Sequence, residues 1–335
     1  MTNNRKNKQI RLAARPTAEV QESHFKLVET EAPNASDGEL VVRAHYLSLD
    51  PYMRGRIDNE KSYAAKVEIG AVMVGSVAGE VVASCHEKFA VGDFVVAPTG
   101  WQAYGVSNGV GVRKVDPSRV PLSAYLGVAG MPGVTAWVGL NEHGRPKPGE
   151  TVVVSAASGA VGSAVGQLAK FKGCRAVGIA GGRAKCDDVV NTLGFDACVD
   201  YKAADFAAAL AAACPKGIDV YFDNVGGPVL DTVLPLMNNF SRIPLCGQIS
   251  GYNDVSQLAI SNMRCFLVSR IALRGFIVSD HMALWPAALK ELAELVQAGR
   301  LNYRESVAAG LENAPRALIG MLRGENLGKQ LVKVI

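Results

Sequence analysis

From about Val128 onward, the chain alternates short apolar runs of strand character with longer runs of helical character. The helical segments Gly162–Lys172 and Phe206–Ala213 are rich in alanine and are typical of crossovers between strands. A strand that is followed repeatedly by a helix builds a parallel sheet with helices on its faces. We therefore predict an α/β domain over residues 128–303 with a Rossmann-type, doubly wound parallel sheet. The expected strands are Thr151–Ser155, Arg175–Ala180, Ala197–Tyr201, Ile218–Asp223, Arg242–Gly247 and Leu273–Val278.

Residues 1–127 follow a different pattern, in which short strand-like runs are divided by Gly, Pro, Asn and Asp. Val41–Tyr46, Val77–Val82 and Gly92–Ala97 are such runs, and they predict a β-rich, barrel-like domain. Residues 304–335 return to strand, helix and strand, and we expect the final run Gln330–Ile335 to pair with the first domain. A chain of 335 residues is too long for one compact core, which agrees with this division.

Charge and cysteine usage exclude several classes of protein. The net charge of +4 is small for this length, and no stripe of Lys and Arg is interleaved with aromatic residues, so a nucleic-acid surface is not expected. No apolar run is long enough for a membrane span, and no apolar segment of a secretory signal follows the basic start. The seven scattered cysteines fit a reducing compartment. We predict a cytoplasmic protein.

A glycine turn follows the first strand of the α/β domain, in the stretch VVVSAASGAVGS (152–163). Such a turn places a dinucleotide pyrophosphate at the amides that begin the next helix. Ala157 occupies the position of the usual first glycine, and this is acceptable if its backbone angles are ordinary. Gly159 and Gly162 stand where the backbone approaches the phosphates and where the helix packs closely. We predict that Gly159, Ala160, Val161 and Gly162 bind a dinucleotide.

The end of the second strand indicates which dinucleotide binds. An Asp or Glu at this point would bind the adenosine ribose 2′-hydroxyl of NAD, but the sequence VGIAGGRAK (177–185) has no carboxylate. Gly181 and Gly182 make room there, and Arg183 and Lys185 supply positive charge for a 2′-phosphate. The alternative is that both are ordinary exposed cations. The missing acid favours NADP(H) over NAD(H).

These features together resemble the zinc-independent branch of the medium-chain dehydrogenase/reductase superfamily. The likeness is greatest to NADPH-dependent alkenal and enone double-bond reductases, which include leukotriene B4 12-hydroxydehydrogenase/prostaglandin reductases and bacterial curcumin reductases. It covers nearly the whole chain. The glycine turn is common to the superfamily, whereas DPYMRG and FDNVGG are specific to this branch. The segments that carry the resemblance are LDPYMRG (49–55), AASGAVGS (156–163), YFDNVGG (221–227), CGQISGYN (246–253) and ENLGKQLV (325–332).

The resemblance implies a GroES-like barrel for the first domain, with substrate and catalytic roles, and a homodimer. It also implies that Lys185 and Tyr201 contact the adenosine 2′-phosphate, although Tyr201 could instead be an aromatic residue that caps a strand end. Asn224 follows a parallel strand, where ligand contacts concentrate, and this position independently favours a binding role. Phe276 could instead belong to the core. The remaining expected cofactor contacts are Gly182, Cys246, Gly247, Ile249, Ser250, Tyr252, Phe276, Ile277, Val278 and Asn326.

A bound zinc ion is not expected. A four-ligand site needs Cys and His residues at short spacing, and the chain has no C-x-x-C sequence. The first domain holds a single cysteine, Cys85, together with His24, His45 and His86. The string DPYMRG stands where zinc-dependent relatives carry a cysteine ligand.

Without a metal, hydride delivery to the β-carbon of an enone is easier than ketone reduction, because hydrogen-bond donors alone can stabilise the enolate oxygen. Tyr252 is our first candidate for this donor and Tyr63 the second, although either could merely line the cleft. The predicted activity is NADPH-dependent reduction of the C=C bond of α,β-unsaturated ketones and aldehydes. An NADPH:quinone oxidoreductase and a catalytically idle NADPH-binding protein are the alternatives. His281 is expected to lie in an exposed loop.

Overall fold

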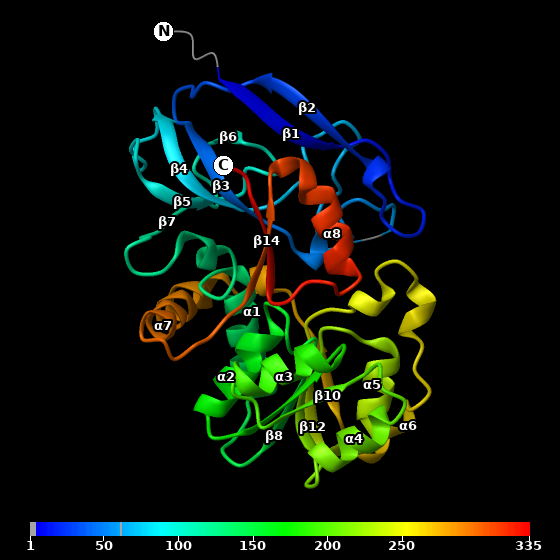
Figure 1. The fold of residues 1–335 in the computed structure, drawn as a ribbon. Coiled ribbons are helices and arrows are strands. Elements are labelled where there is room, and N and C mark those ends of the chain that lie inside the picture. The colour runs from blue at the N-terminus through cyan, green and yellow to red at the C-terminus, as the bar shows by residue number, and fades with distance from the viewer. Residues whose placement is uncertain (1–4, 61) are drawn as a thin grey trace. The chain divides into compact units, whose positions relative to one another are not determined.

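The computed structural model describes residues 5–60 and 62–335. The chain forms two compact units, Met1–Gly127 with Glu305–Ile335, and Val128–Arg304 (Figure 1). Each unit has its own hydrophobic core.

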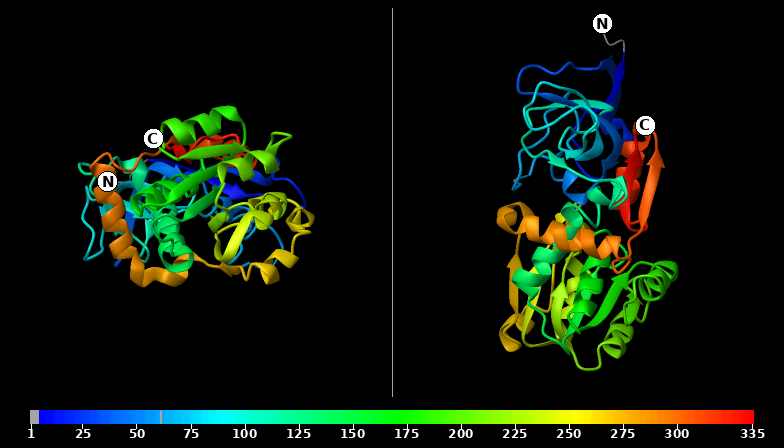
Figure 2. Two further views of the ribbon diagram at one scale, coloured as in Figure 1. Left: turned by 90° about the horizontal axis from the view of Figure 1, so that it is seen from below. Right: turned by 90° about the vertical axis from the view of Figure 1, so that its left-hand side faces the viewer.

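The second unit contains a six-stranded sheet in the order β10-β9-β8-β11-β12-β13, and every strand pair is parallel. Helices lie on both faces of this sheet (Figures 1 and 2). The order reverses between β8 and β11, and ligands of such sheets bind outside the carboxyl ends of the strands at this point. The strands are β8 (Thr151–Ser155), β9 (Arg175–Ala180), β10 (Ala197–Asp200), β11 (Ile218–Phe222), β12 (Met237–Leu245) and β13 (Ala272–Gly275).

The crossover helices begin and end where the sequence predicts, within a few residues. The helix after the glycine turn packs its Ala- and Gly-rich face on the sheet, and all of its residues from Gly162 to Ala169 are buried. The helices of this unit are α1 (Met131–Val138), α2 (Gly162–Phe171), α3 (Arg183–Asn191), α4 (Phe206–Ala213), α5 (Gly227–Val233), α6 (Arg264–Val268) and α7 (Trp285–Gln297).

The predicted doubly wound sheet is therefore confirmed. The bounds of its fifth and sixth strands, β12 and β13, differ from the prediction. The fifth strand begins at Met237, ahead of the expected Arg242. The sixth strand ends at Gly275, because the ring of Phe276 turns into the interior and a 3-10 helix follows over Val278–Leu284.

The first unit is β-rich, as predicted. Its seven-stranded sheet follows the order β14-β15-β3-β4-β5-β7, and β6 pairs with β3. The tail strand β15 pairs with β3 in antiparallel register, Leu331 opposite Ser48. The elements are β1 (Lys6–Leu12), β2 (Phe25–Glu31), β3 (Leu40–Ser48), β4 (Val77–Ser84), β5 (Phe94–Ala97), β6 (Tyr104–Ser107), β7 (Arg113–Lys114), β14 (Glu305–Ala309), α8 (Ala314–Leu322) and β15 (Lys329–Lys333).

A buried ion pair in the first unit joins two of the segments that define the family resemblance. Lys329 Nζ lies 2.6 Å from Asp50 Oδ1 and donates to Leu49 O at 2.5 Å. The other carboxylate oxygen of Asp50 accepts a hydrogen bond from Ser48 Oγ at 2.5 Å. Burial lowers the pKa of Lys329, and the neighbouring Asp50 opposes this shift. The pair ties the tail strand to the loop after β3.

No helix within residues 5–60 and 62–335 is both long enough and apolar enough to cross a bilayer.

Candidate functional site

The glycine turn after β8 tolerates alanine at its first position because of a small partner on the next strand. The left-handed residue of the turn is Ala156, with φ 50°, and not Ala157. The Ala157 methyl group is buried and faces Gly178 of β9, where a Cβ would lie 2.8 Å from it. Gly178 therefore supplies the space that a glycine at position 157 would otherwise provide.

The other two glycines of the turn have different roles. A Cβ on Gly162 would lie 2.3 Å from Ala156 O, so helix α2 can approach the turn only with glycine at this position. A Cβ on Gly159 would meet only Ala156 O, at 3.1 Å, and its other side is open. Within the described residues, the amides of Ala160, Val161 and Gly162 have no protein acceptor. Three open amides at the start of a ten-residue helix fit a pyrophosphate.

Asp223, directly after β11, organises the neighbouring loop. Its carboxylate is fully buried, and burial raises its pKa against the opposing effect of its hydrogen bonds. The acid therefore holds the turn that follows β11, and it is not positioned for proton transfer with substrate. Its Oδ1 accepts from Ser155 Oγ at 3.0 Å, Tyr221 Oη at 2.9 Å, Val225 N at 2.9 Å and Gly226 N at 3.0 Å.

Asn224 lies beside the glycine turn, at the carboxyl ends of β8 and β11. Its backbone amide donates to Ser155 Oγ at 2.8 Å, and its Nδ2 donates to Ser155 O at 2.8 Å. The side chain is thus fixed at the switch point of the sheet, where the resemblance places a cofactor contact.

The loop after β12 folds over the same point. Its backbone is held by hydrogen bonds from Cys246 N to Asp223 O at 2.8 Å, from Ile249 N to Asn224 O at 3.3 Å and from Ser250 N to Val225 O at 3.2 Å. Burial and the charge of Asp223 raise the pKa of Cys246 to about 12, so the thiol is protonated at neutral pH.

Tyr252 ends this loop with its hydroxyl close to Gly247. A Cβ on Gly247 would lie 3.5 Å from Tyr252 Oη and 3.3 Å from Asn224 O. The phenol is therefore near the backbone of Gly247, in the loop after β12, and near that of Asn224, in the loop after β11. A phenol keeps its proton at neutral pH and can donate it in a hydrogen bond.

The expected 2′-phosphate region lies at the ends of β9 and β10. A Cβ on Gly181 would lie 2.9 Å from Tyr201 Cε1, so the Tyr201 ring covers this glycine. Gly182 has φ 91° and precedes helix α3, which carries Lys185 in its first turn. The pKa of Lys185 is lowered by burial and by the charge of Lys202.

Arg183 fits the alternative that it is an ordinary exposed cation. Its side chain is 94% exposed and forms an ion pair with Asp187 at 3.7 Å, one helical turn further along α3. It is therefore engaged on the outer surface of the helix.

The segment Phe276–Val278 follows β13. The Phe276 ring is buried against His143, with ring centroids 4.9 Å apart, and against Phe222 at 6.1 Å. The Phe276 ring therefore belongs to the core, which is one of its two expected roles. The next two residues, Ile277 and Val278, are half-buried. His281 is half-buried, contrary to expectation, because its Nε2 lies 3.3 Å from His143 Nε2.

Two expected site residues, Tyr63 and Asn326, belong to the first unit. Tyr63 is 64% exposed and lies close enough to Tyr52 to contribute to the raised pKa of that phenol, whose main cause is burial. Asn326 is half-buried, and its Nδ2 donates to Gly328 O at 2.7 Å in the turn before β15.

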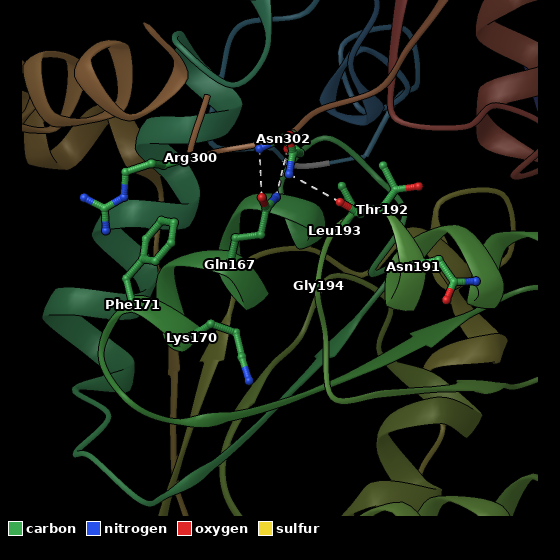
Figure 3. A pocket seen from close by; sticks show the side chains of 9 residues that line it. All are labelled: Gln167, Lys170, Phe171, Asn191, Thr192, Leu193, Gly194, Arg300 and Asn302. Carbon is green, nitrogen blue, oxygen red and sulfur yellow. Dashed lines mark hydrogen bonds between the residues drawn. The ribbon is translucent and has the colours of Figure 1, made fainter. Parts of the chain in front are cut away.

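A polar cavity of about 240 Å³ lies elsewhere in the second unit and contains none of the expected cofactor residues. Figure 3 shows Gln167 and Asn302 joined across it by hydrogen bonds of 2.8 Å in both directions. The lining residues are Gln167, Lys170, Phe171, Asn191, Thr192, Leu193, Gly194, Arg300 and Asn302.

Comparison with known proteins finds relatives that match both units of the chain. A family model described as the N-terminal domain of oxidoreductase matches residues 8–115, and one described as zinc-binding dehydrogenase matches residues 160–296. The NADPH-dependent curcumin reductase of Escherichia coli K12 is 46% identical, covering 98% of this chain and 97% of its own. The NADP-dependent 2-alkenal reductase of Nicotiana tabacum is 43% identical, with coverage of 98% and 97%.

The solved structures give the same result. CurA from Vibrio vulnificus in complex with NADPH has a TM-score of 0.93 and 48% sequence identity, covering 98% of this chain and 99% of that chain. The fold and the open glycine turn define a dinucleotide-dependent oxidoreductase of the medium-chain type. Within that class, the chain belongs to the zinc-independent family of NADPH-dependent enone and alkenal reductases. The family predicted from the sequence is confirmed.

The described residues include no group of three or more His, Cys, Asp or Glu side chains placed to hold a metal ion.

Sequence reasoning missed one residue near the candidate site. Lys202 was not considered, although it directly follows Tyr201. The sequence did contain a signal. Arg183 and Asp187 are four residues apart and can pair on one helix, which leaves Lys202 as another cation near the expected 2′-phosphate site.

Proposed function

We propose that this chain is an NADPH-dependent reductase of the C=C bond of α,β-unsaturated ketones and aldehydes. The observation that carries the proposal is the position of the Tyr252 hydroxyl beside Gly247 and the Asn224 backbone, at the switch point of the sheet. This position supplies a neutral donor where a substrate carbonyl oxygen would lie next to a bound nicotinamide.

The residues present fit NADP(H). The open amides of Ala160, Val161 and Gly162 would donate hydrogen bonds to the pyrophosphate, and Asn224 and the loop 246–252 line the nicotinamide side. At the adenosine end, Lys185 and Tyr201 take the 2′-phosphate. Gly182, Ile277, Val278 and Asn326 complete the proposed contacts.

NADPH, when bound, supplies the hydride that adds to the β-carbon of the substrate. Tyr252 donates a hydrogen bond to the substrate carbonyl oxygen, which gains negative charge as the enolate forms. Uptake of a proton at the α-carbon then completes the saturated product. Tyr63, in the first unit, is the second candidate for this donor, and the first unit is assigned the substrate-binding role.

Measuring NADPH oxidation against a panel of short alkenals, aryl enones and quinones tests the proposed activity. We expect turnover of the enones and alkenals, and NMR of the product formed with C4-deuterated NADPH should place deuterium on the β-carbon. Preferential turnover of quinones would favour a quinone oxidoreductase. NADPH binding without oxidation by any compound in the panel would favour an idle binding protein.

The role of Tyr252 is tested in the same assay. Because a preorganised oxyanion donor contributes roughly 100-fold to the rate, Tyr252→Phe should lower kcat by about this factor. The Kd for NADPH, measured by fluorescence, should change by less than about threefold, since the remaining cofactor contacts are intact. An unchanged kcat would transfer the role to Tyr63, with Tyr63→Phe as the next variant.

We also propose a cytoplasmic homodimer. Strand β13 is the edge of the sheet, and all four of its residues are exposed. Apolar side chains close to it in sequence are exposed as well, with Leu267 at 79% and Met263 at 59%. An unpaired edge beside exposed apolar residues suits pairing with a second copy. All seven cysteines are free thiols, the form that a reducing compartment maintains.

A further inference from the structure

The surface around Gly181 in the second unit contains a lysine that the sequence motifs do not identify. A Cβ on Gly181 would lie 3.1 Å from Lys202 Cε, almost as close as to the Tyr201 ring. The Lys202 ammonium lies over that ring, 5.9 Å from its centroid. Two consecutive side chains therefore cover the same glycine, and one of them is a cation.

Asp200 fixes this arrangement. Its Oδ1 accepts hydrogen bonds from Gly182 N at 2.8 Å and from Lys202 N at 2.9 Å. These two backbone bonds lower the pKa of Asp200, so the carboxylate is charged and already engaged with amides. It ties the start of α3 to the turn after β10. The backbone of Lys202 is thereby held beside the helix that carries Lys185.

Two neighbouring lysines give this surface a charge that suits an anionic ligand. Lys202 is near enough to Lys185 to lower the pKa of that residue, in addition to the effect of burial. Two ammonium groups that repel each other are stabilised when a multiply charged anion lies between them. Arg183 is directed elsewhere, since it pairs with Asp187 and is almost fully exposed.

We infer that Lys202 is the second cation of the 2′-phosphate site and that, together with Lys185, it determines the preference for NADPH over NADH. Arg183 does not share this role. The inference rests on the proposed use of NADP(H). The Lys202 ammonium lies over the face of the Tyr201 ring, and Gly181 provides the space for both side chains.

Isothermal titration of the full chain with 2′,5′-ADP and with 5′-AMP tests this inference, because the two probes differ only in the 2′-phosphate. For Lys202→Met we expect the affinity for 2′,5′-ADP to fall roughly tenfold, as for loss of one charge-assisted hydrogen bond. The affinity for 5′-AMP should stay within about twofold. Arg183→Met is the matched control, since it removes one positive charge from the outer surface of helix α3, and both of its affinities should stay within about twofold.

The double variant Lys185→Met/Lys202→Met separates a shared phosphate site from general surface charge. If both lysines hold one phosphate, the combined loss in 2′,5′-ADP affinity should differ from the product of the single losses. Equal effects of Lys202→Met and Arg183→Met on 2′,5′-ADP would overturn the inference. If the unaltered chain bound both probes equally, the proposed NADPH preference itself would fail. A preference abolished by Lys185→Met and unaffected by Lys202→Met would reject Lys202 alone.

Discussion

At the scale of single residues, a buried ammonium group has an unusual position. Lys329 is almost fully buried and contacts the Asp50 carboxylate and the Leu49 carbonyl, while Ser48 satisfies the other side of the carboxylate. A buried ion pair is costly to break because the remaining charge has no partner and little water. The segments LDPYMRG and ENLGKQLV thus have a structural role in the first unit, separate from any contact with cofactor.

Replacing this lysine provides a test. Lys329→Met should lower the free energy of unfolding by about 3–5 kcal/mol, because it leaves Asp50 buried as an unpaired carboxylate. The measurement is urea unfolding at pH 7, followed by the fluorescence of tryptophan, which includes the fully buried Trp101 of the same unit. Lys329→Met/Asp50→Asn should recover part of the loss. A single variant within about 1 kcal/mol of the original chain would contradict this account of the pair.

At the scale of elements, the strand-turn-helix unit from β8 to α2 combines two kinds of glycine. Gly162 contributes to stability, since a Cβ there would overlap the backbone of Ala156. Gly159 has room on its outer side, and its role is to let a ligand approach the backbone. Although the residues are three positions apart in one turn, the same substitution should affect different properties at each.

Alanine substitutions at both positions test this distinction. Gly162→Ala should lower the free energy of unfolding by about 1–3 kcal/mol through overpacking against Ala156 O. Gly159→Ala should change it by less than about 1 kcal/mol and weaken NADPH binding roughly tenfold, because a methyl group would occupy the phosphate side. Thermal unfolding without ligand and titration with NADPH provide the two measurements. If both variants lowered the free energy of unfolding equally, Gly159 would not have the open space on its outer side that the structure gives it.

At the scale of the whole molecule, the edge strand β13 is the feature that the fold leaves uncovered. Its neighbours in sequence present apolar side chains, and Phe240 of the adjacent strand β12 is 69% exposed. Monomeric proteins protect such edges with charge or with bulges. A second copy that pairs along β13 would cover the edge and bury the apolar residues around it.

Light scattering after gel filtration should therefore report twice the mass of one chain. Leu267→Glu/Leu273→Glu places two charges at the proposed interface and should give monomers at micromolar concentration. Val110→Glu, at a side chain 73% exposed in the first unit, is the matched control and should stay dimeric. A chain that is monomeric before substitution, or a double variant that stays dimeric, would argue against the β13 interface.

The sequence by itself determined the order of strands and helices, the position of the glycine turn between β8 and α2 and the preference for a phosphorylated cofactor. Those properties depend on local patterns, because strand and helix periodicity, a glycine-bearing turn and a missing acid are each visible within a few neighbouring residues. The confirmed sheet and family rest on such local information.

Only the tertiary structure decided which polar groups meet. Arg183 and Lys202 are both cations close in sequence to the expected phosphate contacts. Arg183 pairs along its own helix, whereas Lys202 lies beside Gly181 and the Tyr201 ring, with its backbone amide held by Asp200. The buried Asp223 and the Ala157–Gly178 contact likewise join segments that are distant in the chain. Electrostatic and packing energies depend on distances in space, and these are set only when the strands align in the sheet.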